Sequence, residues 1–187
     1  MFDKKDVFDF LYQSISDAQQ TIRALDIKAG FVFLILLAPL PFAQEIYHHA
    51  LTDCHRSSFG LVVVICAVTT WLLAIIMQFI TISAIIDPQK KIQSPTGVEG
   101  SFFAGGLYSF NFVEAICGSN VLSKNSLDEQ IALLPKDHDQ IIRELTFERM
   151  KLSFILALKS KRSRFSNMFT LIWLISSAIL CIVDRVT

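Results

Sequence analysis

The sequence lacks the short motifs on which most enzyme active sites are built. It has no P-loop, no Gly-x-Ser-x-Gly, no His-Glu-x-x-His and no glycine-rich phosphate loop. Its one Gly-Gly pair, at 105 and 106, is too short to cradle a phosphate. The acidic residues are spread along predicted helices, as on ordinary solvated faces. We therefore expect a protein that is not an enzyme and that needs no cofactor.

Cysteine and histidine are too scattered to predict a metal centre. The four cysteines lie far apart without a Cys-x-x-Cys pair, and they are Cys54, Cys66, Cys117 and Cys181. We interpret them as unpaired small hydrophobic residues. One short stretch combines His48, His49 and His55 with an Asp and a Cys, but it lacks the helical spacing of a zinc motif. A polar loop is the favoured interpretation, and no metal site is expected.

Charge is also scarce, and its scarcity indicates a membrane protein. Charged residues make up 18% of the chain, against about a quarter in soluble domains, while 52% of the residues are hydrophobic and sixteen are Phe. The net charge of zero gives no reason to expect a nucleic-acid partner. Residues 1–9 alternate acids, lysines and phenylalanines and do not form a signal peptide. The chain is expected to insert through its own spans.

The N-terminal segment predicts an amphipathic helix over residues 3–25 that continues into a first span at 27–43. Apolar residues recur on one helical face, at Val7, Leu11, Ile15, Ala18, Ile22 and Leu25. No Pro or Gly precedes Gly30, so nothing interrupts the helix before the apolar run. Pro39 and Pro41 close that run.

Two further apolar runs, 59–86 and 165–183, predict the second and third spans. Gln78 is a polar member of the second run, and a hydrogen bond to a neighbouring helix is favoured over a role in a conduction path. Asp87-Pro88 ends this run. The basic cluster Lys159, Lys161, Arg162 and Arg164 stands directly before the third run.

The section between the second and third spans is predicted to be helical and exposed to water. A short helix is expected within the aromatic-rich 102–113 and another within 127–134, before Pro135. Nothing breaks a helix over 136–183, and one stripe of it carries Ile141, Leu145, Leu152, Ile155 and Leu156. Glu148 and Lys159 fall on the same stripe. We expect them to fix the register by pairing across it, with Arg23, Asp17 and Asp26 as the partners that the first helix offers.

Lysine and arginine counts predict the orientation. They number eleven in residues 87–166 and four in 1–28, but one in 44–58 and one in the C-terminal tail. By the positive-inside rule, the N-terminus and the large section are cytoplasmic, and the C-terminus lies outside.

The expected fold is therefore an all-α integral membrane protein with three transmembrane helices, two of which continue into a cytoplasmic helical bundle. The expected order is cytoplasmic helix 1–26, span 27–43, periplasmic loop 44–58, span 59–86, cytoplasmic helical region 87–164, span 165–183 and periplasmic tail 184–187.

The segment Leu25-Asp26-Ile27-Lys28-Ala29-Gly30 resembles the Asp-x-Lys-Ala signature of the Pycsar transmembrane effector family of bacterial anti-phage systems. Ser101-Phe102-Phe103-Ala104-Gly105 resembles the Phe-Phe-Gly region of that family, with Ala104 in the place of an expected Gly. Residues 144–165 resemble its last cytoplasmic helix, and the order of spans agrees.

The resemblance implies a partner cyclase that makes cyclic CMP or cyclic UMP during infection. The effector, expected as a homo-oligomer in the bacterial inner membrane, would then impair that membrane and cause abortive infection. Asp26 and Lys28 lie at the joint between helix and span, so they are the candidate coupling residues, although they could equally serve only to anchor the span. By residue type, Lys124 and Arg143 are candidate phosphate partners, and Phe103 and Tyr108 are candidate stacking surfaces. Ordinary solvated cations and core aromatics are the alternative.

Two other functions stay open at this stage. One is a constitutive membrane scaffold or assembly subunit, which would be harmless with or without a trigger. The other is an effector similar to the SLATT membrane proteins, with a different trigger. A membrane enzyme would require a turnover activity that depends on His48, His49 and His55.

Overall fold

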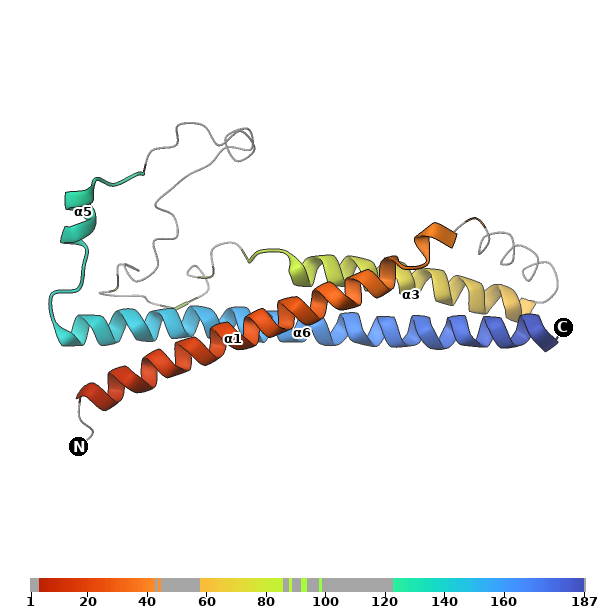
Figure 1. Cartoon of the computed structure of the whole chain (residues 1–187), viewed down its shortest axis with the longest axis horizontal. Helices are drawn as coiled ribbons and strands as arrows, with labels where there is room; N and C mark the ends of the chain where they lie inside the picture. Colours follow the sequence, from red (N-terminus) through yellow and green to blue (C-terminus); the bar gives the residue numbers. More distant parts are fainter. Residues whose placement is uncertain are drawn as a thin grey trace. The chain divides into compact units, whose positions relative to one another are not determined.

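The computed structural model describes residues 4–42, 44, 58–85, 88, 92–93, 98 and 123–186. Regular structure in these residues is helical: α1 (Lys4–Leu37), the 3-10 helix η1 (Leu40–Phe42), α3 (Ser58–Ile82), α5 (Leu127–Ala132) and α6 (His138–Val186) (Figure 1). The all-α fold class predicted from the sequence is confirmed. The histidines of the 44–58 loop and the aromatic segment 102–113 lie outside the described residues.

α1 is one helix that begins in a charged segment and ends in an apolar one. Leu11 and Ile15 are buried on the predicted face, and the other members of that face are half-buried. The helix ends at Leu37 because the proline at 39 has no N–H to donate and restricts the residue before it. The predicted continuation of the first helix into the apolar run is confirmed.

The second apolar helix is shorter than the sequence predicted. α3 ends at Ile82 rather than at Ile86. The Ser83 hydroxyl and the Ser83 N–H both donate to the carbonyl of Phe79, at 2.8 and 3.0 Å. A serine hydroxyl that bonds the carbonyl of its own helix competes with the backbone ladder at this end of α3. The remaining 25 residues still exceed the roughly 20 that a bilayer core requires.

α5 and α6 both begin at side-chain caps. The Ser126 hydroxyl accepts a hydrogen bond from the N–H of Glu129, whose carboxylate accepts one from the N–H of Ser126. The Asp137 carboxylate accepts a hydrogen bond from the N–H of Gln140 at 2.7 Å. From there α6 runs for 49 residues. The short helix before Pro135 and the long unbroken helix after it are both confirmed.

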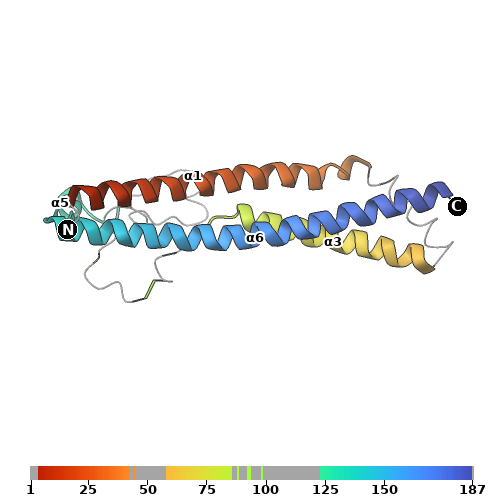
Figure 2. The same ribbon diagram turned by 90° about the horizontal axis from the view of Figure 1, so that it is seen from below.

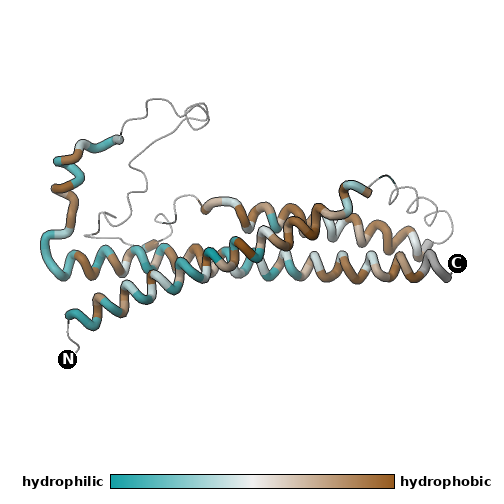
Figure 3. Tube along the Cα trace, in the orientation of Figure 1, coloured by the Kyte–Doolittle hydropathy of each residue, from teal (hydrophilic) through white to brown (hydrophobic). Residues whose placement is uncertain are grey.

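Within the described residues, three helical segments are long and apolar enough to cross a membrane: Lys4–Phe42, Phe59–Ile82 and His138–Ile182. Figure 3 shows hydrophobic residues concentrated along α3 and along the second halves of α1 and α6, whereas the first halves of α1 and α6 are mixed. The chain is a membrane protein on this evidence, as its composition predicted.

The chain divides into two compact units, and each contains part of α1 and part of α6. We call Met1–Gln19 with Asp87–Phe154 the amphipathic unit, and Gln20–Ile86 with Ile155–Thr187 the membrane unit.

In the amphipathic unit, α1 packs on α6 through apolar side chains and ring contacts. The buried apolar residues are Leu11, Ile15, Leu145, Phe147 and Leu152. The Phe8 ring meets the His138 ring edge-on, with centroids 5.7 Å apart, and the Arg149 guanidinium lies 5.2 Å from the centroid of the Phe10 ring. The predicted stripes on both helices therefore face each other in this unit.

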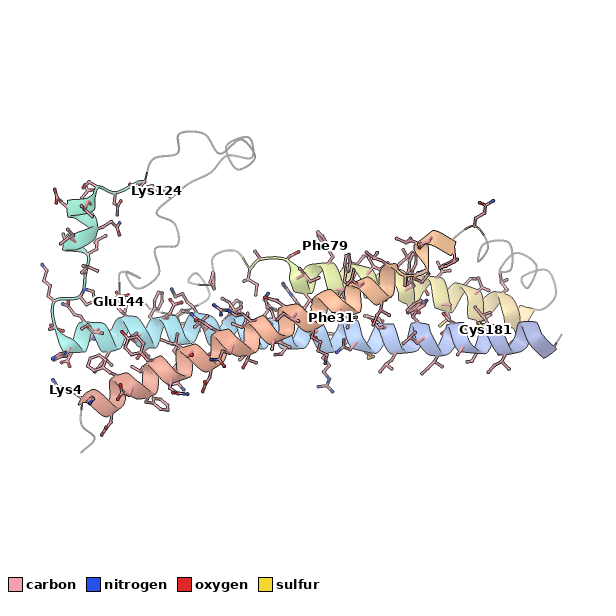
Figure 4. The ribbon with its side chains drawn as sticks, in the orientation of Figure 1. Lys4, Phe31, Phe79, Lys124, Glu144 and Cys181 are labelled. Atoms are coloured by element: carbon pink, nitrogen blue, oxygen red, sulfur yellow. The ribbon has the colours of Figure 1, made fainter. Side chains whose placement is uncertain are left out.

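The membrane unit has small and polar residues inside and large apolar residues outside. Its buried apolar side chains are Ala29, Leu36, Ala67 and Ala74, and its buried polar ones are Thr70, Gln78, Thr81, Lys159, Ser163, Ser166, Thr170 and Ser176. Large residues such as Phe31 and Phe79, both labelled in Figure 4, are 65% exposed. Small residues let α1, α3 and α6 lie alongside one another (Figure 2). An apolar exterior of this kind is suited to lipid rather than to water.

Candidate functional site

Five residues join the three helices of the membrane unit, and we call them the interhelical junction: Asp26 and Ala29 on α1, Gln78 on α3, and Lys159 and Ser166 on α6. Gln78 is 1% exposed. Its side-chain amide donates to the backbone carbonyl of Ala29, and its Oε1 accepts from the Ser166 hydroxyl. One side chain therefore ties α3 to both other helices, which confirms that Gln78 bonds a neighbouring helix.

The second link of the junction is an ion pair between α6 and α1. The Lys159 ammonium contacts Asp26 Oδ1, and the Lys159 side chain is 8% exposed while that of Asp26 is 41% exposed. The acid therefore reaches water, and the buried base depends on it for neutralisation. Sequence reasoning offered Arg23, Asp17 and Asp26 as partners across the stripe, and the structure selects Asp26 for Lys159.

The Gln78 hydrogen bonds and the Asp26–Lys159 ion pair use one face of α1 and one face of α6. Asp26 and Ala29 are three residues apart on α1, while Lys159 and Ser166 are seven apart, or two turns, on α6. The ion pair lies where the charged part of each helix meets its apolar part. The amide lies deeper, and in an apolar surrounding such a group needs partners because no water can supply them.

Two further contacts hold the same three helices. The Arg162 guanidinium donates to the carbonyl of Ile80 near the end of α3, at 3.2 Å. The Trp71 indole N–H donates to the carbonyl of Leu36 at 2.8 Å, near the end of α1. These contacts fix the levels of α3 and α6, and of α1 and α3, relative to one another within the membrane unit.

Gly30 follows the junction carbonyl of Ala29, yet packing does not require a glycine there. A methyl group built on Gly30 would meet no atom within 4 Å. Because glycine in a helix interior is less stable than alanine by roughly 0.5–1 kcal/mol, we expect Gly30→Ala to raise the melting temperature of the purified protein by a few degrees. Thermal melts followed by helical circular dichroism measure this shift. A melting temperature below that of the parent would show that the glycine meets a need that the packing does not reveal.

The other residues predicted for function are less well placed. Lys28 is exposed on α1, next to the buried Ala29. Lys124 and Arg143 are both exposed, three residues before α5 and in the second turn of α6. Phe103 and Tyr108 lie outside the described residues. The prediction that these four residues form a ligand site therefore stays a prediction, because two of them lie outside the described residues.

Glu148 is buried as its place on the stripe predicted, but its ion pair lies within α6 rather than across the stripe. Its carboxylate contacts the ammonium of Lys151 three residues on, and both side chains are less than a tenth exposed. Lys151 also lies 5.0 Å from the centroid of the Phe147 ring. Lys151 lies three residues after Glu148 on the same face of one helix, so the two side chains are neighbours as soon as the helix forms. A partner on another helix would first have to be brought close by packing.

A shallow, open hollow of about 360 Å³ lies in the amphipathic unit. It is lined by Thr146, Arg149, Met150 and Ser153 of α6. Arg149 is the residue whose guanidinium covers Phe10. The hollow is thus lined by a cation, two hydroxyl side chains and a methionine, and its cation also covers the ring of Phe10, which does not line it.

Sequence reasoning missed Ser166 and Lys151. Ser163, Ser166 and Thr170 recur at intervals of three and four from the basic cluster into the third apolar run, which is the signal of a polar stripe facing other helices. Lys151 lies three residues after Glu148, a spacing that predicts an intrahelical pair.

The described residues contain no group of His, Cys, Asp and Glu side chains that could hold a metal ion. No family model, no curated protein and no solved structure matches this chain.

Proposed function

We propose that the chain is a membrane effector that binds its trigger on the amphipathic unit and responds by changing the packing of its membrane helices. The trigger would be a cyclic pyrimidine mononucleotide, cCMP or cUMP, and the result would be impairment of the bacterial inner membrane during phage infection. One observation supports this most. α1 and α6 each run unbroken from an amphipathic half into an apolar half, and the interhelical junction ties both to α3.

The energies involved are compatible with a ligand-driven switch. Hydrogen bonds between membrane helices average about 0.6 kcal/mol and reach about 1.7 kcal/mol. Moving a two-state equilibrium from one side to the other takes about 5.5 kcal/mol of differential binding. A junction of two side-chain hydrogen bonds and one half-exposed ion pair is therefore stable at rest, yet within the range that one bound nucleotide can overcome.

Impairing a membrane in this way needs more than one copy of the chain. The interior of the membrane unit is filled by side chains, with Leu36, Ala74 and Gln78 each at most 1% exposed. Three such helices do not enclose a channel, so a conducting path would form between copies. The proposal includes a homo-oligomer, a partner pyrimidine nucleotide cyclase, and an orientation with the N-terminus and residues 87–164 in the cytoplasm.

The hollow at Arg149 is the place for the nucleotide that the described residues favour. A cyclic nucleotide needs a cation for its phosphate and a flat apolar surface for its base. Arg149 and Phe10 supply the two side by side, whereas Lys124 and Arg143 are both exposed on separate segments.

Dye release from liposomes tests the function. The purified protein is reconstituted and exposed to cCMP, cUMP, cAMP or no nucleotide. We expect release with one pyrimidine nucleotide and little with cAMP or without ligand. Arg149→Gln is expected to lower the response at least about tenfold, because a charged hydrogen bond to phosphate is worth about 1.5–3 kcal/mol. Arg143→Gln serves as the matched variant that removes a cation from the same helix.

The outcomes distinguish the alternatives. Loss of response in Arg143→Gln alone would move the nucleotide site to the residues predicted from the sequence. No release with any nucleotide, from protein shown to be inserted and folded, would favour a membrane scaffold. Release with a trigger that is not a pyrimidine nucleotide would favour an effector of the SLATT type.

A further inference from the structure

We propose that cations at one end of the membrane unit form a collar that binds the headgroups of anionic phospholipids. The collar comprises Arg23 and Lys28 on α1 and Lys161, Arg162 and Arg164 on α6. This interaction is independent of the function proposed above, because it concerns the lipid around the protein and not the trigger.

Two contacts place the collar at a single level of the membrane unit. Asp26 on α1 contacts Lys159 on α6, and Arg162 donates to the carbonyl of Ile80, two residues before the end of α3. Residues 23–28 and 159–164 therefore lie side by side. Each stretch advances about 7.5 Å along its helix, which is close to the roughly 5–7 Å thickness of one headgroup layer.

Charge is unbalanced at this level. The structure describes the side chains of residues 20–37, 59–85 and 155–182 in this unit. These residues include six lysines and arginines but a single acid, Asp26. Asp26 contacts Lys159. The five collar residues thus carry positive charge that no acid in this described part of the unit neutralises. Anionic phosphates in the adjacent lipid layer are the complementary charge.

The exposure pattern matches a headgroup layer above lipid tails. Arg23, Lys28, Lys161 and Arg164 are exposed, and Arg162 is half-buried. Large exposed apolar residues continue beyond the collar on both helices, from Phe31 of α1 and from Phe165 of α6, and Ile27 within the collar is exposed as well. Three of the five cations are arginines, whose planar guanidinium binds phosphate oxygens in pairs. Each cation near an anionic surface strengthens binding about fivefold.

Thermal melts in lipid nanodiscs test the collar. The full chain is placed in nanodiscs of phosphatidylcholine alone or with phosphatidylglycerol, and we expect the melting temperature to be roughly 4–8 °C higher with the anionic lipid. A variant with Arg23, Lys28, Lys161 and Arg164 changed to Gln is expected to lose most of that difference. A control with Lys4, Lys5, Lys136 and Arg143 changed to Gln removes the same charge from the amphipathic unit and should keep it.

Three results would overturn the proposal. One is a parent protein that melts at the same temperature in both lipids, a comparison that needs no variant to fold. Another is a control variant that loses as much of the difference as the collar variant. The third is inorganic phosphate that reproduces the stabilisation in phosphatidylcholine nanodiscs, which would assign the site to a soluble phosphate instead of a lipid.

Discussion

Replacing Asp26 by Lys is expected to destabilise the membrane unit by about 2–4 kcal/mol, and adding Lys159→Asp is expected to restore at least half of the loss. In the single variant, two ammonium groups face each other, and the Lys159 side chain is 8% exposed. The upper values for a broken buried pair do not apply in full, because Asp26 is 41% exposed and water screens it. The expected fall in melting temperature is roughly 4–16 °C.

Lys28→Asp is the matched control for this charge swap. It also reverses one charge on α1, two residues further on, but at an exposed position. We expect it to change the stability by less than about 0.5 kcal/mol. Melts of the parent, both single variants, the double variant and the control in one detergent give the coupling energy. If the double variant loses as much stability as the two single variants lose together, the two residues do not interact.

Leu152→Glu is expected to disrupt the amphipathic unit, with a loss of about 3–5 kcal/mol. Leu152 is 8% exposed on the stripe of α6 that faces α1, and a carboxylate there would lie one turn from the buried Glu148. Lys151 already pairs with Glu148, and the Arg149 guanidinium three residues before position 152 already covers the Phe10 ring, so a partner for the new charge would have to give up an existing contact. Unfolding of this unit is measured by proteolysis of the N-terminal segment and by melts of helical circular dichroism.

Ser153→Glu controls for helix propensity and for net charge. It adds the same charge one residue later, at an exposed position on α6. We expect its melt to match that of the parent within about 0.5 kcal/mol. Equal melts for Leu152→Glu and Ser153→Glu would show that this stripe is not buried against α1 in the membrane-inserted protein.

The sequence predicts the helices well because the position of each helix depends on residues within that helix and at its ends. The face of α1 with Leu11 and Ile15 follows the helical period, and the absence of Pro and Gly before Gly30 leaves that helix unbroken. The end of α3 was misplaced by four residues. Apolar residues continue to Ile86, and hydropathy does not register a serine side chain that bonds the carbonyl of Phe79.

The junction could be predicted only in part, because contacts between helices depend on their rotation and axial offset. Gln78 had to bond something, since an amide in an apolar run needs partners, but the sequence does not say that they are Ala29 and Ser166. Likewise, the position of Lys159 on an apolar stripe predicted that it pairs with an acid, and the first helix contains two candidates, Asp17 and Asp26. Only the packing of α1 on α6 selects Asp26.

The residues predicted for ligand contact stay a prediction, because Phe103 and Tyr108 lie outside the described residues. Lys124 and Arg143 were chosen by side-chain type, and type alone does not bring two residues together in space. The pairing of Arg149 with Phe10 joins residues more than a hundred positions apart, and no local pattern indicates it.

The measurement that tests the account most directly is the distance between α1 and α6 in the membrane unit, with and without nucleotide. Spin labels on Ile27 and Ser160, both exposed and close to the Asp26–Lys159 pair in sequence, report it by pulsed electron spin resonance in liposomes. The four native cysteines are first replaced by Ala or Ser, and a pair on Ser160 and Met168 of α6 alone serves as the reference. We expect the Ile27–Ser160 distribution to shift with the nucleotide that releases dye, while the reference stays unchanged. An unchanged Ile27–Ser160 distribution at a nucleotide concentration that releases dye would contradict a switch in helix packing.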